Sequence, residues 1–144
     1  MEHQNLNEIY LFHLEKAYKQ FKKYKNDCFK KEGIDLTGDQ WVVLKSIHEN
    51  EGIHQIELAK KCFKEPASVT RILDVLERKT WVERRSMPND RRTYELYTTD
   101  SGKLLIGKIL PLAVNIRAKG MEGIAAAELD NLSKMLVKIF DNFS

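Results

Sequence analysis

The sequence predicts a mainly α-helical protein with one small two-stranded β-ribbon. Two observations predict this class. Apolar side chains recur at spacings of three and four residues along most of the chain, which is the period of amphipathic helices. A single stretch, residues 81–98, instead alternates polar and apolar side chains around a Pro-Asn-Asp turn, which is typical of a β-hairpin.

The composition indicates a folded protein of one domain. The chain has 144 residues, of which 42% are apolar and 31% charged, and this length allows a real hydrophobic core. No run approaches the length of a membrane span, and residues 1–10 lack the long apolar core of a signal peptide. Two cysteines, Cys28 and Cys62, cannot build a disulfide framework. We therefore expect a cytoplasmic protein.

The first predicted helix runs from Leu6 to Phe29, and Gly33 ends it. Its apolar side chains form a narrow stripe, of the kind that packs against another helix. The stripe consists of Tyr10, Leu14, Ala17, Phe21, Tyr24 and Cys28.

Three shorter helices follow. Thr37 and Gln40 have the spacing of a capping box, which predicts the start of the second helix. Residues 54–62 form the third helix, and Pro66 stands where a fourth could begin, because proline is tolerated at the first helical position. The buried face of the fourth helix is predicted to consist of Val69, Ile72, Leu73 and Leu76.

The ribbon comes next, with strands at Trp81–Met87 and Arg92–Thr98. Thr99 then begins a long helix in which Pro111 predicts a kink. The last helix, residues 125–143, has a second narrow apolar stripe. This stripe consists of Leu129, Leu132, Leu136, Ile139 and Phe143. The order of elements is that of a winged helix–turn–helix with a helical segment on each side.

The positive charge is concentrated in the ribbon. Residues 84–92 hold four arginines against one aspartate, which equals the net charge of +3 for the whole chain. A fourth helix that enters the major groove, beside a ribbon whose arginines reach a narrow minor groove, would bind DNA. The candidate helix residues are Ala67, Ser68, Thr70, Arg71 and Arg78, and the candidate wing residues are Arg84, Arg85, Asn89, Asp90, Arg91 and Arg92.

Three stretches, together with the flanking helices, resemble the MarR family of winged helix–turn–helix transcriptional regulators. "LTGDQWVVL" (Leu36–Leu44) is similar to the family's second-helix entry, and residues 56–84 are similar to its helix–turn–helix. "DRRTYELYTTDSG" (Asp90–Gly102) matches its wing signature. The flanking helices match in position and length, so the resemblance covers essentially the whole chain. Phe63–Pro66 departs from the family's Gly-Val-Ser-like turn.

The resemblance implies a single MarR-type domain over residues 1–144, with the DNA-binding part at about residues 36–99. Dimerisation helices would occupy about residues 5–32 and 100–144. It further implies a ligand-responsive repressor that binds a pseudo-palindromic operator as a homodimer. Arg92 would insert into the minor groove and Asp90 would pair with an arginine to orient the tip. Arg84 and Arg85, which enter the hairpin, would meet phosphates.

A small effector is a further implied partner. A pocket between the dimer helices and the DNA-binding part would involve Tyr10, His13 and Trp41, and the alternative for Trp41 is a core position. Cys28 follows Lys25 and precedes Lys30, so lysines could lower the pKa of its thiol and favour a redox role. The alternative is that Cys28 has no such role.

Other classes of function lack support in the sequence. The four histidines show no metal-ligand spacing, and no cofactor is expected. No nucleophile–base constellation, P-loop or dinucleotide motif is present, so we do not expect an enzyme. A winged-helix protein-interaction module without specific DNA binding stays as the alternative. Steep salt dependence of DNA binding separates the two possibilities.

Overall fold

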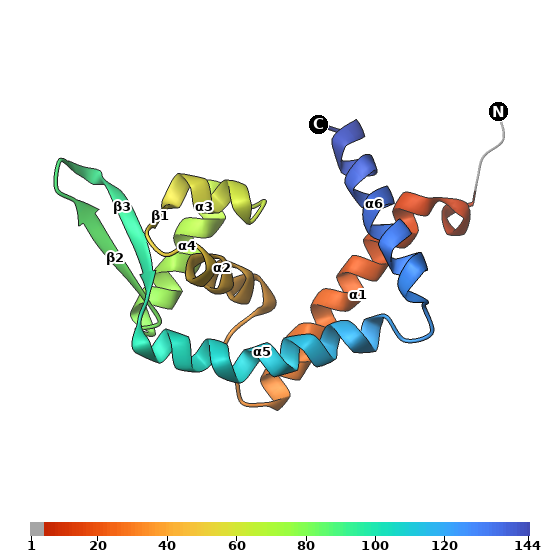
Figure 1. Ribbon diagram of the computed structural model, residues 1–144, viewed down its shortest axis with the longest axis horizontal. Helices are drawn as coiled ribbons and strands as arrows, with labels where there is room; N and C mark the ends of the chain where they lie inside the picture. Colours follow the sequence, from red (N-terminus) through yellow and green to blue (C-terminus); the bar gives the residue numbers. More distant parts are fainter. Residues whose placement is uncertain (1–4) are drawn as a thin grey trace. The chain divides into compact units, whose positions relative to one another are not determined.

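A computed structural model describes residues 5–144, apart from the side chains of Asn7, Arg91 and Arg92. Helices dominate, and a small antiparallel sheet is the other component, as the sequence predicts. In chain order the elements (Figure 1) are η1 (Leu6–Glu8), α1 (Tyr10–Lys31), α2 (Gly38–Glu49), β1 (Ile53–His54), α3 (Gln55–Lys61), α4 (Pro66–Arg78), β2 (Val82–Met87), β3 (Asp90–Thr98), α5 (Asp100–Gly120) and α6 (Ala126–Asn142).

The chain divides into two compact units, one ending at Leu110 and the other beginning at Pro111. The first unit contains α1 to α4, the sheet and the first half of α5, and the second contains the rest of α5 and α6. Helix α5 runs through Pro111 without a break in its assigned range. Because proline has no N–H to donate, the helix lacks one backbone hydrogen bond at the boundary between the units.

The predicted capping box at the start of α2 is confirmed. The Thr37 hydroxyl accepts from the Gln40 backbone N–H at 3.1 Å, and the Gln40 side-chain oxygen accepts from the Thr37 backbone N–H at 3.0 Å. Asn26 of α1 adds a third contact, because its Oδ1 accepts from the Gly38 backbone N–H at 2.7 Å. These bonds join the end of α1 to the start of α2.

The core of the first unit lies between α2, α4 and the sheet. Val69, Leu73 and Leu76 of α4 are fully buried, in agreement with the predicted face, and Ile72 is half-buried. Trp41 of α2 is 5% exposed, so it belongs to the core. Other fully buried side chains are Phe29, Val43, Leu44, Ile47, Leu58, Leu96 and Ile109.

The sheet has a strand that the sequence did not predict. Its order is β1-β3-β2, with all neighbours antiparallel. Strand β1 pairs Ile53 with Leu96, and His54, expected to begin a helix, pairs with Glu95 instead. Two residues are too few to show a periodicity, so this strand follows only from its partner. Strand β3 begins at Asp90, two residues earlier than expected, opposite an irregularity in β2 near Met87.

The start of α5 is fixed against the start of the wing. The Thr99 hydroxyl accepts from the Gly102 backbone N–H at 3.0 Å and donates to the Thr80 carbonyl at 2.5 Å. Gly102 is buried, and a Cβ atom there would overlap the carbonyl oxygen of Trp81. Only glycine therefore allows this close approach of α5 to the segment that leads into β2.

Candidate nucleic-acid interface

The outward face of α4 carries the side chains that the sequence assigned to it. Ala67, Thr70, Arg71 and Arg78 are exposed, and Ser68 is half-buried. Pro66 is the first residue of the helix, as predicted, and the residue before it has extended backbone. The first turn of α4 thus offers small side chains and a backbone that a base edge can approach.

Two sets of hydrogen bonds order this face. Gln55, the first residue of α3, donates its Nε2 to the Thr70 hydroxyl at 2.8 Å. The Thr70 hydroxyl in turn donates to the Pro66 carbonyl at 3.0 Å. One turn away, the Arg71 guanidinium donates to the Ser68 hydroxyl at 3.3 Å. Sequence reasoning missed Gln55, because its contact joins residues 15 positions apart and leaves no local pattern.

The turn between α3 and α4 is built around Phe63 and Lys64. Phe63 has a φ of 50° and is 80% exposed, so a bulky residue stands in the left-handed region where glycine is favoured. Lys64 pairs with Asp39 at the start of α2 at 3.0 Å, and Lys22 of α1 pairs with the same carboxylate at 3.2 Å. Burial alone would raise the pKa of Asp39, but the hydrogen bonds from Lys64 and Lys22 outweigh it and lower the pKa.

The wing is the hairpin of β2 and β3, which projects past the helices of the first unit (Figure 1). Asn89 and Asp90 are exposed at its tip. The Asp90 carboxylate accepts from the Thr93 hydroxyl at 2.8 Å, which braces the start of β3. The side chains of Arg91 and Arg92 lie outside the described residues, so the predicted minor-groove insertion of Arg92 stays a prediction.

Arg84 and Arg85 have different surroundings within β2. The Arg84 guanidinium reaches back to α4, where it lies 2.8 Å from the Asp74 carboxylate and 3.4 Å from that of Glu77. The Arg84 side chain is 20% exposed, whereas that of Arg85 is 54% exposed. Arg85 stacks over the Tyr97 ring at 4.0 Å. Arg84 therefore joins the wing to α4, and Arg85 presents more of its charge to solvent.

A groove separates the start of α4 from the wing. Its volume is about 580 Å³. Most of its lining is apolar, and Ile56 contributes to it; an acid, Glu57, and a base, Lys60, stand in the same lining. The lining includes His54, Gln55 and Lys60 before α4, Pro66 at its start, and Thr93 and Tyr94 on β3.

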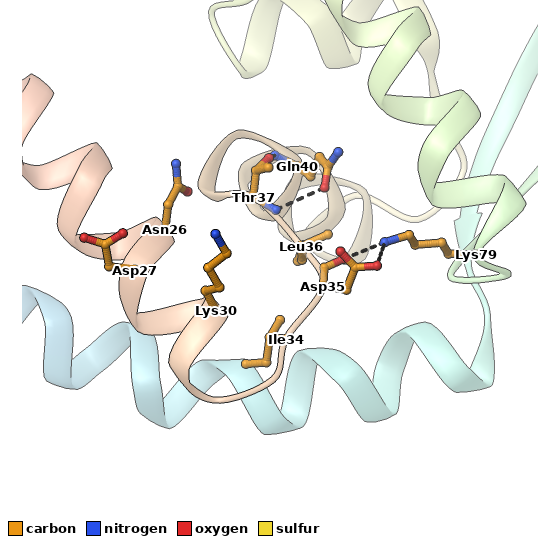
Figure 2. A pocket seen from close by; sticks show the side chains of 9 residues that line it. All are labelled: Asn26, Asp27, Lys30, Ile34, Asp35, Leu36, Thr37, Gln40 and Lys79. Atoms are coloured by element: carbon orange, nitrogen blue, oxygen red, sulfur yellow. Dashed lines mark hydrogen bonds and ion pairs between the residues drawn. The ribbon is translucent and has the colours of Figure 1, made fainter.

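A second pocket, of about 340 Å³, lies where α1, the start of α2 and the end of α4 meet. Figure 2 shows Lys79 turned toward Asp35 in this pocket, where its ammonium donates to the Asp35 carbonyl at 2.7 Å and pairs with the carboxylate. Lys30 and Asp27 line the opposite side, so the charges are mixed.

The predicted effector residues are not brought together around either of these cavities. Tyr10 is 88% exposed on α1, His13 is also exposed, and Trp41 is buried in the core. None of the three lines the groove beside the wing or the pocket of Figure 2. A pocket that uses all three stays a prediction.

The described residues contain no group of three or more side chains suited to hold a metal ion. Cys28 and Cys62 are both half-buried free thiols. Burial raises the pKa of the Cys62 thiol, which disfavours the reactive thiolate. Among the described helices, none combines the length and the apolar character needed to span a membrane.

Comparison with known proteins places these features in context. Residues 36–94 match the model of the MarR family. A mutant of E. coli MarR complexed with operator DNA is 26% identical, covers 95% of this chain and 99% of its own, and has a TM-score of 0.83. The S. aureus MepR–DNA complex is 21% identical over 93% and 98% of the two chains, with a TM-score of 0.83. B. bronchiseptica BpsR, whose DNA binding is regulated by 6-hydroxynicotinic acid, is 21% identical over 97% and 99%, with a TM-score of 0.89.

Proposed function

We propose that this chain, whose residues 36–94 match the MarR family, is a transcriptional regulator of that family that binds double-stranded DNA. We propose further that it acts in the cytoplasm as a homodimeric, ligand-responsive repressor on a pseudo-palindromic operator. The observation that carries the proposal is that one compact unit holds both an exposed α4 face and an arginine-bearing wing.

Both elements have a place on a DNA duplex. The first turns of α4 enter the major groove with Ala67, Thr70 and Arg71, while Arg92 at the wing reaches the flanking minor groove. The sugar–phosphate backbone that separates the two grooves then passes between α4 and the wing. The groove of about 580 Å³ lies at that place, and Lys60 in its lining supports this docking, whereas Glu57 in the same lining opposes a phosphate.

The wing needs a fixed angle to α4 for such docking. The two carboxylates of Asp74 and Glu77 hold Arg84, and the pairing also neutralises acids that would otherwise repel phosphates. Arg85 pairs with Glu83 of its own strand at 3.3 Å, and its half-exposed side chain can reach a phosphate from there. The proposed DNA contacts of the wing are therefore led by Arg92, with Asn89, Asp90 and Arg91 at the tip and Arg84 and Arg85 as lesser phosphate contacts.

The proposed homodimer rests on apolar side chains that the single chain leaves exposed. On α1, Leu14, Phe21 and Tyr24 are each 40% exposed. On α6, Phe140 is 52% exposed and no residue is buried, and Phe143, directly after the helix, is 77% exposed. Burying a fully exposed side chain of this size stabilises a complex by about 1.5–3 kcal/mol, and the partly covered ones contribute in proportion to the area they still expose. A dimer through residues of about 5–32 and 100–144 would also place two α4 helices on successive turns of DNA, about 34–36 Å apart.

Control by a small aromatic acid is the remaining part of the proposal. BpsR, which shares the fold, responds to 6-hydroxynicotinic acid. An acid of this kind would act on the present protein by changing the separation of the two α4 helices in the dimer. Linkage then requires that DNA weakens binding of the acid by the same factor that the acid weakens binding of DNA.

The test is selection of a preferred duplex from a random library by the purified full chain, followed by fluorescence anisotropy between about 50 and 200 mM salt. We expect selection of a two-fold repeated sequence and an affinity that falls steeply as salt rises, because bound arginines release counterions from the duplex. Failure to enrich any sequence, together with salt-independent weak binding, would overturn the proposal and favour a protein-interaction module.

A further inference from the structure

The hydroxyl of Thr70 makes two hydrogen bonds within the protein, although Thr70 lies on the exposed face of α4. It donates to the Pro66 carbonyl, one turn earlier, at 3.0 Å. It accepts from Nε2 of Gln55, the first residue of α3, at 2.8 Å. The two helices of the helix–turn–helix thus hold this one side chain from both sides.

These two bonds decide what Thr70 can offer to a base. A hydroxyl has one proton to donate and two lone pairs that accept. The proton goes to Pro66 and one lone pair to Gln55, so no proton remains for a base acceptor. The γ-methyl group makes no such bond and is the apolar part of an exposed side chain.

We propose that Thr70 recognises a thymine by contact between its γ-methyl group and the thymine C5-methyl group in the major groove. The C5-methyl group is the feature of thymine that accepts apolar contact, and threonine methyls are suited to it. Gln55 is the positioning residue, because its amide holds the hydroxyl on the protein side. This inference rests on the proposed function, since it needs α4 in the major groove.

The neighbourhood of Thr70 leaves room for a base edge. Ala67, three positions earlier, lies on the same side of the helix and is exposed, and its side chain is a single methyl group. Arg71 is directed along the helix to Ser68, with 3.3 Å between the guanidinium and the hydroxyl. Small side chains around a methyl group allow a base to approach closely, which favours apolar contact with the methyl group over a hydrogen bond from a long polar side chain.

The test uses the duplex selected by the wild-type chain and replaces one thymine at a time by 2′-deoxyuridine, which lacks only the C5-methyl group. We expect one position in each half-site at which the wild type binds about fourfold more weakly, as for one lost methyl contact. Thr70→Ser keeps the hydroxyl and removes the methyl group, and it should bind the two duplexes equally. Thr70→Val keeps the methyl group and should retain the discrimination.

The role of Gln55 as a positioning residue is tested by the ratio of the affinities for the thymine duplex and the 2′-deoxyuridine duplex. Gln55→Ala leaves the Thr70 methyl group in place but releases the hydroxyl, so the preference for thymine over uracil should decrease without vanishing. A general loss of stability would lower both affinities and leave this ratio unchanged. An unchanged ratio in Gln55→Ala would therefore remove Gln55 from the proposal.

Several outcomes would overturn the proposal that Thr70 recognises a thymine. These are a wild type insensitive to uracil at every thymine, a Thr70→Ser variant that still discriminates, and a Thr70→Val variant that does not. The wild-type scan decides by itself if a variant fails to give a normal circular dichroism spectrum. A selection that enriches no duplex contradicts the proposed function instead, so the two failures are distinguishable.

Discussion

The contact between α5 and the entry to the wing predicts a large effect of one added methyl group. In Gly102→Ala the new Cβ atom would overlap the Trp81 carbonyl oxygen and lie 3.1 Å from the Trp81 carbonyl carbon. Both are backbone atoms, which cannot rotate away. Overpacking of this kind costs about 1–3 kcal/mol, whereas alanine gains about 1 kcal/mol in helix propensity. The net expectation is a loss of up to roughly 2 kcal/mol in the free energy of unfolding.

The same helix offers a matched control. A Cβ atom at Gly107 would meet nothing within 4 Å, and this glycine is exposed. Gly107→Ala should therefore stabilise the protein by up to about 1 kcal/mol. The two substitutions are chemically identical and lie five residues apart in α5, so opposite signs would isolate the contact with Trp81.

Thermal denaturation followed by circular dichroism measures both effects, at one fixed protein concentration because a dimer's stability depends on it. Each kcal/mol shifts the midpoint by roughly 4 °C for a domain of this size. Because Trp81 leads into β2, Gly102→Ala should also displace the wing and weaken binding to the selected duplex, whereas Gly107→Ala should not. A Gly102→Ala variant as stable as Gly107→Ala would refute the reasoning.

Four further predictions follow from the same structure. Removal of residues 130–144 deletes most of the apolar side chains of α6, so sedimentation should find monomers or aggregates, and a stable truncated dimer would contradict the proposed interface. Arg92→Ala should lower affinity at least about tenfold, roughly 1.4 kcal/mol, mainly on A·T-rich flanks. Arg84→Ala, which leaves Asp74 and Glu77 of α4 unpaired by it, should lower affinity on all sequences alike; anisotropy with both flanks would show equally uniform losses for both variants if the tip were only an electrostatic anchor. Because the pKa of Asp39 is lowered in the folded state, its stabilising effect is present above the unfolded value near pH ~4 and is lost on acidification, so urea denaturation of Asp39→Asn should depend less on acid pH. Hydroxylated aromatic acids should weaken DNA binding in anisotropy, and affinity untouched across a panel of them would remove this class of effector.

Local signals were sufficient to predict the helices that carry the interface. Pro66 and the spacing of Val69, Leu73 and Leu76 predict both the start and the buried face of α4, and the structure confirms them. The Thr37 capping box is confirmed in the same way. Such features are readable because a cap or an amphipathic face depends on residues within a few positions of one another.

Contacts between distant residues could not be predicted. From the sequence, Arg84 is one of four cations in a basic hairpin. In the structure it pairs with Asp74 and Glu77 of the preceding helix. One of the two hydrogen bonds of the Thr70 hydroxyl comes from Gln55, which belongs to another helix. Neither pairing has a periodicity or a motif, because each depends on how two elements pack.

The order and most of the bounds of the helices, the hairpin, and the concentration of arginines in it could be predicted from the sequence, because these depend on neighbours along the chain. The third strand, which β1 adds through Ile53 and Leu96, and the need for glycine at position 102 beside Trp81 became visible in the folded structure alone. The folded structure also decided which charges of the wing are already paired. Strand partners, close backbone approaches and ion pairs join residues far apart in the chain, and folding alone brings those residues together.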